Sequence, residues 1–154
     1  MKKILCLLSA IILCFGITGC TKNKEKNIEG SLTEIMSNLY KGISEDEMPM
    51  MTENIELNSE NFEYYAFSSD IKYKEAIASE SMTGSTAHSV VLIRLEDKRD
   101  SKKVVDEIKE KANPRKWICV EAENTYVLSK DDLVVLIMSN ELAPKIKSNF
   151  ENLK

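Results

Sequence analysis

Two side chains in this sequence have the types that nucleophilic catalysis needs: the thiol of Cys119 and the imidazole of His88. An imidazole base that activates a thiol forms a dyad able to attack carbonyl groups. Cys119 lies in the apolar run Trp117–Val120, however, where burial would raise the pKa of the thiol and leave the cysteine inert. His88 is expected at the edge of a strand, in a structural or exposed position. We therefore predict that the protein is not an enzyme, and a thiol-dependent enzyme using Cys119 and His88 is the alternative.

A run of methionines is the second candidate site. Met48, Met50 and Met51 flank Pro49 in a stretch without helical or strand periodicity. Thioether sulfur is a ligand that Cu(I) prefers, while methionine also fills irregular apolar gaps and serves adaptable binding surfaces. Packing of the loop, contact with a partner and a copper site are the three interpretations. The functional prediction that we retain is contact with a protein partner or a small ligand.

The segment Arg115-Lys116-Trp117 is the third candidate, because it combines two cations with a large aromatic ring. Such a set is typical of anion or carbohydrate binding, and we predict a contact site for a ligand or partner here. In a structural interpretation, Trp117 would instead anchor the core. The two cations would then pair with nearby carboxylates, Glu121 or Glu123.

Other chemistry is excluded by what the sequence lacks. It contains no glycine-rich phosphate loop and no nucleophile elbow. A single histidine and, beyond position 20, a single cysteine rule out a zinc site of the usual Cys/His type. We predict no catalytic residue, no metal and no cofactor.

The chain begins with the pattern of an export signal. Lys2 and Lys3 give a positive start, an apolar run follows over residues 4–15, and small residues precede Cys20. This pattern is typical of a secretory signal peptide, and the run is shorter than the ~20 apolar residues that span a bilayer. We assign residues 1–19 to the signal peptide and 20–30 to a lipidated cysteine with a flexible tether, which leaves 31–154 as a single domain.

Residues 17–20, Ile-Thr-Gly-Cys, resemble the lipobox of bacterial lipoproteins. The resemblance implies a diacylglycerol on the Cys20 thiol and cleavage between Gly19 and Cys20. Two acyl chains are enough to anchor a protein stably. The expected product is an outward-facing protein held at the cell membrane by lipid.

Charge and cysteine content limit the class further. Loss of the signal takes the 21 basic residues to 19 against 25 acidic ones, a net charge near −6. We expect no nucleic-acid partner, because the phosphate backbone selects basic surfaces. Cys6 and Cys14 leave with the signal, so no internal disulfide is expected and an apolar core must stabilise the domain.

The elements that position the candidate residues follow from periodicity and turn signals. Ser31 and Glu34 form a capping-box pattern ahead of an apolar helical stripe. Helices are expected over residues 31–43, 100–112 and 140–153. Strand character is expected over residues 62–67, 75–82, 89–95, 117–120, 125–129 and 133–138, while residues 44–61 lack periodicity.

These elements predict an α+β fold, an antiparallel sheet with two helices on one face plus the N-terminal helix. The run Val-Val-Leu-Ile occurs twice, at 90–93 and at 134–137, each time before a predicted helix. The two occurrences indicate a strand–turn–strand–helix pseudo-repeat. The alternative is that two buried strands share a common apolar composition.

The runs Ala87–Arg94 and Asn113–Glu123 resemble those of a group of uncharacterised lipoproteins of clostridia-type Gram-positive bacteria. The similarity extends over about Leu32 to Phe150 and includes the Met-Pro-Met stretch and residues 60–65. It implies a location between membrane and wall and the extent of the domain, and it brings no activity.

The predicted function is that of a lipid-anchored extracytoplasmic module that binds a protein partner or a small ligand. Its membrane contact is the diacylglycerol on Cys20. Besides the thiol-dependent enzyme, an accessory lipoprotein of a transporter is the remaining alternative.

Overall fold

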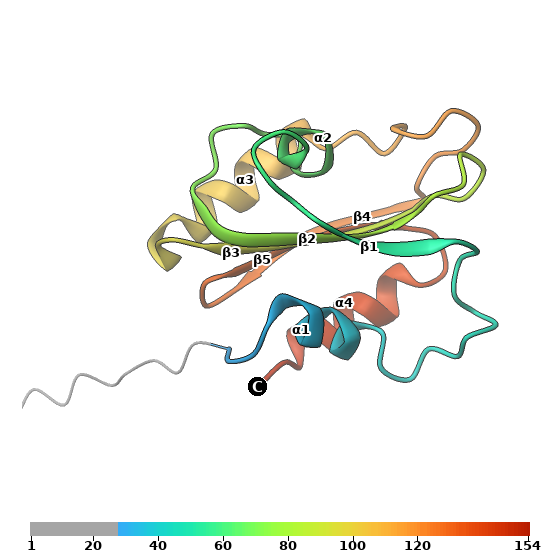
Figure 1. The fold of residues 1–154 in the computed structure, drawn as a ribbon, viewed down its shortest axis with the longest axis horizontal. Helices are drawn as coiled ribbons and strands as arrows, with labels where there is room; N and C mark the ends of the chain where they lie inside the picture. Colours follow the sequence, from blue (N-terminus) through green and yellow to red (C-terminus); the bar gives the residue numbers. More distant parts are fainter. Residues whose placement is uncertain (1–27) are drawn as a thin grey trace, which may run out of the picture.

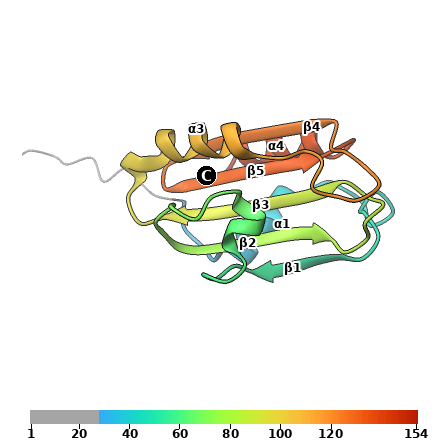
Figure 2. The ribbon, with the colours of Figure 1, turned by 90° about the horizontal axis from the view of Figure 1, so that it is seen from above.

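The computed structural model describes residues 28–154. The predicted signal peptide, Cys20 and most of the predicted tether lie outside these residues. A five-stranded antiparallel sheet in the order β1-β2-β3-β5-β4 forms the centre of the domain (Figures 1 and 2). Its strands are β1 (Thr52–Glu56), β2 (Tyr73–Ser81), β3 (His88–Leu95), β4 (Asn124–Lys130) and β5 (Leu133–Ser139). The helices are α1 (Leu32–Leu39), α2 (Phe62–Ala66), α3 (Ser101–Lys111) and α4 (Ala143–Glu151).

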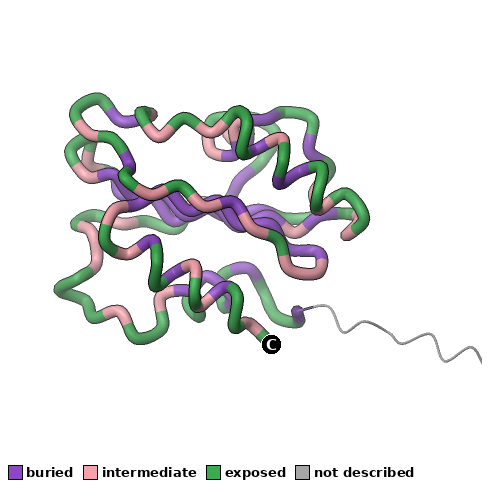
Figure 3. The backbone as a smooth tube through the Cα atoms, turned by 180° about the vertical axis from the view of Figure 1, so that it is seen from behind, coloured by how far each residue is buried: buried purple, intermediate pink, exposed green. Residues whose placement is uncertain are grey.

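Helices cover both faces of the sheet (Figure 1). α1 and α4 pack on one face, and α2 and α3 pack on the other, so the sheet separates two apolar cores. The central strands β3 and β5 are buried on both faces, as their uninterrupted apolar runs require (Figure 3). Within residues 28–154, every helix falls short of the length and apolar character that a membrane span requires.

The predicted α+β class with an antiparallel sheet is confirmed, and α1 begins as expected. Ser31 Oγ accepts a hydrogen bond from Glu34 N at 3.3 Å, and Glu34 Oε2 accepts one from Ser31 N at 2.9 Å. Both halves of the capping box are therefore present. The placement of the helices differs in one respect: the two that share a face are α1 and α4, and α3 lies opposite.

The repeated Val-Val-Leu-Ile runs explain why α3 and α4 lie on different faces. Val91 in β3 faces the α3 side together with its partner Leu136 in β5, whereas Val135 faces the α4 side. The second residue of each run thus faces the helix that follows its own strand. The two-fold axis that relates the antiparallel neighbours β3 and β5 would keep equivalent side chains on the same face of the sheet. Val91 and Val135 lie on opposite faces instead. The predicted repeat therefore holds for the order of the elements but not for the side of the sheet on which each helix packs.

The predicted strand at residues 62–67 is wrong, because local turn chemistry overrides its aromatic content. Phe62 N donates to Asn58 O at 2.9 Å, and Asn58 N donates to Asn61 Oδ1 at 2.8 Å. These bonds start the short helix α2, since asparagine favours turns through its side-chain amide. Phe67 ends α2 in the left-handed region, with φ 59°.

Two further expectations are corrected. The segment 44–61, expected to lack regular structure, contains the short edge strand β1. Residues 117–120, predicted as a strand, form a loop instead. In that loop Trp117 is buried while Ile118 is 94% exposed, so the apolar run does not line a single buried face.

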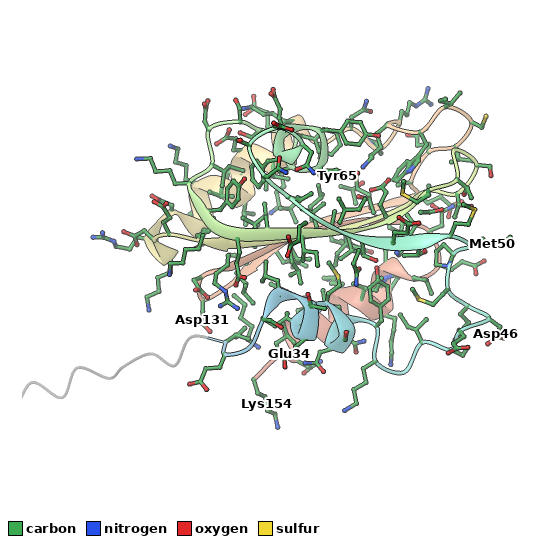
Figure 4. All side chains as sticks on the ribbon, in the orientation of Figure 1. Glu34, Asp46, Met50, Tyr65, Asp131 and Lys154 are labelled. Atoms are coloured by element: carbon green, nitrogen blue, oxygen red, sulfur yellow. The ribbon has the colours of Figure 1, made fainter. Side chains whose placement is uncertain are left out.

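The first described residues, where the chain enters the domain, lie beside the β4–β5 turn. Arg94, near the end of β3, donates to the carbonyl oxygens of Ile28 at 3.0 Å and Gly30 at 2.8 Å. Figure 4 shows Asp131, in the β4–β5 turn, and Met50 at opposite ends of the sheet. The chain therefore enters the domain at one end, and the methionine run lies at the other.

Candidate functional site

Three loops meet at the end of the sheet that lies away from Ile28. They are residues 44–51, 82–87 and 113–123, which we call the distal loops. Met82 N donates to Met51 O at 3.0 Å, and Cys119 N donates to Gly84 O at 3.4 Å. The loop 82–87 therefore joins the other two. All the candidate contact residues of the domain lie in these loops.

Four exposed side chains of the distal loops form what we call the apolar patch. They are Met50 (77% exposed), Met51 (64%), Met82 (50%) and Ile118 (94%). Met51 precedes Thr52 and Met82 follows Ser81, the residues paired at the end of the β1–β2 ladder, so the two methionines lie side by side there. An exposed apolar group of this kind is typical of a surface that binds a partner.

Met48 is separated from the apolar patch. It lines a pocket of about 360 Å³ between α1 and β1, together with Tyr40 and Ser79. The methionines predicted as one site are thus divided between a surface and a pocket. Within residues 28–154, no group of three or more His, Cys, Asp and Glu side chains is placed to hold a metal ion.

Beside the apolar patch, Lys116 and Trp117 enter a buried polar site. The Lys116 ammonium lies 2.9 Å from Glu80 Oε2, and the two side chains are only 4% and 7% exposed. Ser89 Oγ lies 3.4 Å from the same nitrogen. Trp117 Nε1 donates to Glu80 Oε1 at 3.1 Å, so the carboxylate binds a cation and an indole with separate oxygens.

Aromatic rings surround the same ammonium group. Lys116 Nζ lies 4.9 Å from the ring centroids of both Tyr64 and Tyr65, 5.4 Å from that of Trp117 and 6.0 Å from that of Phe67. The faces of aromatic rings attract cations at these distances. We call these four rings, together with Glu80, the aromatic cage. Tyr65, on the α2 side of the sheet, is labelled in Figure 4.

Sheet register and α2 together build the aromatic cage. Glu80 in β2 pairs with Ser89 in β3, and the side chains of such a pair share a face, here the one that carries α2 and α3. α2 supplies Tyr64 and Tyr65, and Phe67 is the left-handed residue that ends this helix. Three separate stretches of chain, 64–67, 80–89 and 116–117, thus converge on one ammonium group.

The electrostatics of this site suit the holding of a cation. Burial lowers the pKa of the Lys116 amine, and the charge and hydrogen bond of Glu80 oppose that shift. A neutral lysine beside a serine is the arrangement of a Ser-Lys nucleophile. Here Ser89 is fully buried and the amine is held by a carboxylate, so the geometry favours retention of an ammonium group.

His88 lies on the opposite face of the sheet from the aromatic cage. Its Nε2 is 2.8 Å from Tyr40 Oη, and its Nδ1 is 2.9 Å from Ser139 Oγ. Both ring nitrogens are engaged, and burial lowers the pKa of His88 to about 4. Cys119 is exposed, contrary to the expectation of a buried thiol. The structure therefore does not bring together the Cys119–His88 dyad of the alternative interpretation.

The buried imidazole predicts a loss of stability in mild acid. The pKa of His88 falls from 6.5 in the unfolded chain to about 4 in the fold, so below pH 6.5 only the unfolded state takes up the proton. The neutral ring makes its full contribution to the free energy of unfolding above pH 6.5. This contribution decreases as the pH falls from 6.5 to about 4. The free energy of unfolding should fall by about 3 kcal/mol over that range.

Urea unfolding between pH 7 and pH 4.5 measures this effect. His88 is the only histidine of the chain, and the carboxyl groups that begin to titrate near pH 4.5 contribute equally in a variant that lacks only the imidazole. The matched control is His88→Gln, which keeps a polar side chain but does not titrate. An equal acid dependence in His88→Gln would refute the assignment.

The two cations that precede Trp117 have different partners. Arg115 pairs with Glu121 at 2.7 Å on the surface, as the structural interpretation predicted, whereas Lys116 pairs with Glu80. Sequence reasoning missed Glu80 and the aromatic residues of α2. One available signal was the acidic residue at an inward-facing position of β2, since carboxylates are rarely buried unless they are paired.

The site is defined by its own contacts rather than by a likeness to a known protein. The lipoprotein resemblance of the sequence stays a prediction. Comparison with known protein families, curated proteins and solved structures gives no match to this chain.

Proposed function

We propose that this protein is a lipid-anchored extracytoplasmic binding module, held at the membrane through Cys20 and binding a protein partner through the apolar patch. The signal pattern of residues 1–20 supports the anchor. The observation that carries the binding role is the exposure of Met50, Met51, Met82 and Ile118 together on adjoining loops. Apolar side chains gathered at one end of a domain are costly to leave in water unless a partner covers them.

The direction of the patch supports the same proposal. Arg94 holds Ile28 and Gly30 at one end of β3, and the distal loops adjoin the other end. The stretch from Ser89 to Arg94 spans about 17 Å at the rise of a strand. A partner reaching the domain from the side away from the anchor would therefore meet the apolar patch first.

Crosslinking in the native membrane tests the proposal. The wild-type chain is compared with Met50→Ser/Ile118→Ser, two changes at exposed positions that preserve the core. A dominant crosslinked protein should be recovered with the wild type and reduced at least ~10-fold with the patch variant, the loss expected when central apolar contacts of an interface are removed. The control, Lys74→Ser/Glu110→Ser, changes exposed residues elsewhere and should retain the partner. Equal recovery with the patch variant would contradict this surface as the interface.

The anchor is tested in the same cells by Cys20→Ala. Without the acyl chains the protein should leave the membrane fraction or remain unprocessed, since each buried CH₂ contributes about 0.8 kcal/mol to membrane binding. A Cys20→Ala protein of processed size that still sediments with the membrane would remove the anchor from the proposal.

A further inference from the structure

The aromatic cage has the composition of a recognition site for an ammonium group. The rings of Tyr64, Tyr65, Phe67 and Trp117 offer π faces to one nitrogen, and Glu80 supplies the opposite charge at 2.9 Å. Rings around a cation are the arrangement by which proteins bind ligand ammonium groups. In this structure the occupant is a side chain of the protein itself.

The walls and the occupant of the cage are held differently. Glu80 lies within β2, and Tyr64 and Tyr65 lie within α2, so most of the cage belongs to regular elements. Lys116 comes from the loop 113–123, which has neither helix nor strand. Its long unbranched stem allows the ammonium to leave by rotation of side-chain bonds, while Trp117 stays bound to Glu80.

The cage lies directly beneath the surface. Tyr64 is 61% exposed although its ring centroid lies 4.9 Å from the buried ammonium. The position of Lys116 Nζ is therefore bordered by a ring that itself reaches the surface. The burial of Lys116 also carries a desolvation cost, since an ammonium group is strongly hydrated in water. Release of Lys116 to solvent would recover that hydration.

We propose that the aromatic cage is a binding site for the primary alkylammonium group of an external ligand, and that Lys116 is its internal, displaceable occupant. Primary ammonium is the class that fits, because Glu80 and Ser89 both lie within reach of N–H donors on the present occupant. A quaternary ammonium ion satisfies the rings but donates nothing to these oxygens. The inference adds a ligand class to the proposed binding role and concerns a site separate from the apolar patch.

An internal occupant weakens the apparent affinity for any external one. The ligand binds only the fraction of molecules in which the cage is vacant, so its apparent dissociation constant rises by the inverse of that fraction. Removal of Lys116 should therefore tighten binding, and removal of an unrelated lysine should not. Lys147 is the matched control, because its Nζ lies 5.1 Å from the Tyr126 ring on the opposite face of the sheet.

Titration with n-propylammonium, which has the atoms of a lysine side chain beyond Cβ, tests the proposal. Trp117 is the only tryptophan of the chain, so its fluorescence reports the cage directly. The full chain in a nonionic detergent is titrated at constant ionic strength against sodium chloride. Wild type and Lys147→Ala should saturate alike, Lys116→Ala should saturate at concentrations at least ~10-fold lower, and tetramethylammonium should bind each protein more weakly.

The outcomes separate this inference from the proposed partner binding. If wild type shows no saturable change at a hundred times the midpoint of Lys116→Ala, Lys116 is a fixed structural residue and the inference is overturned, whatever crosslinks at the apolar patch. If Lys116→Ala unfolds, the wild-type titration alone decides, and a response to n-propylammonium no larger than that to sodium chloride overturns the inference. Tighter binding of tetramethylammonium than of n-propylammonium would likewise overturn the assigned class.

Discussion

Lys116→Ala is expected to lower the free energy of unfolding by about 3–5 kcal/mol, a large share of the 5–15 kcal/mol typical of a domain. The substitution leaves the Glu80 carboxylate buried with Trp117 Nε1 as its remaining charge-stabilising contact. It also removes a cation from between the rings of the aromatic cage. The loss reflects the penalty of an unpaired buried charge more than the strength of the pair itself.

Arg115→Ala is the matched control, one residue away in the sequence. The pair of Arg115 with Glu121 has a similar separation, 2.7 Å, but its side chains are 76% and 47% exposed. Water screens exposed pairs, so this change should cost at most about 1 kcal/mol. Urea unfolding of both variants and of Glu80→Gln/Lys116→Met measures the contrast. The double variant leaves neither charge of the Glu80–Lys116 pair and should recover most of the free energy of unfolding that Lys116→Ala loses. Equal losses for Arg115→Ala and Lys116→Ala would refute the buried pair.

This contrast also marks how far the sequence predicts the site. Exposed side chains pair with neighbours along the chain, and the expected partner of Arg115, Glu121, is the one observed. Lys116 pairs with a residue 36 positions earlier, because the fold of α2 and the register of β2 and β3 decide what lies under the loop. Periodicity predicted β3, β5 and α3, whose apolar patterns are long and regular.

The face of the sheet that each helix covers is harder to predict from the sequence, because it depends on the order of the strands in the sheet rather than on the pattern of any one strand. Each Val-Val-Leu-Ile run is buried on both faces, so its pattern alone does not say which face its helix covers. The side-by-side pairing of β3 with β5 decides the matter, since it places Val91 and Val135 on opposite faces. Similarly, only the bonds between the distal loops reveal that the exposed side chains of Met82 and Ile118 belong to the same end of the domain as Met50.

The second large effect concerns the end of the domain where the chain comes in from Cys20. Arg94→Ala is expected to lower the free energy of unfolding by about 3 kcal/mol or more, because it leaves the buried carboxylate of Asp132 unpaired. Asp132 is 4% exposed, and the Arg94 guanidinium reaches its oxygens at 3.3 and 3.4 Å. The same guanidinium donates to Glu75, at 2.7 Å, and to the two carbonyl groups at the start of the described chain.

Arg94→Ala should also affect the entry of the chain, because the planar guanidinium carries several N–H donors that bind separate partners at once. The guanidinium binds Ile28 and Gly30 while it neutralises a carboxylate, so its loss should free residues 28–31 as well as destabilise the sheet. Amide hydrogen exchange should accelerate there more than in α4, and Arg94→Lys should restore part of the stability without restoring protection at residues 28–31. Glu75→Gln, which removes only the half-exposed partner, should cost at most about 1 kcal/mol. Unchanged exchange at residues 28–31 in Arg94→Ala would mean that contacts other than those of Arg94 hold the entry of the chain.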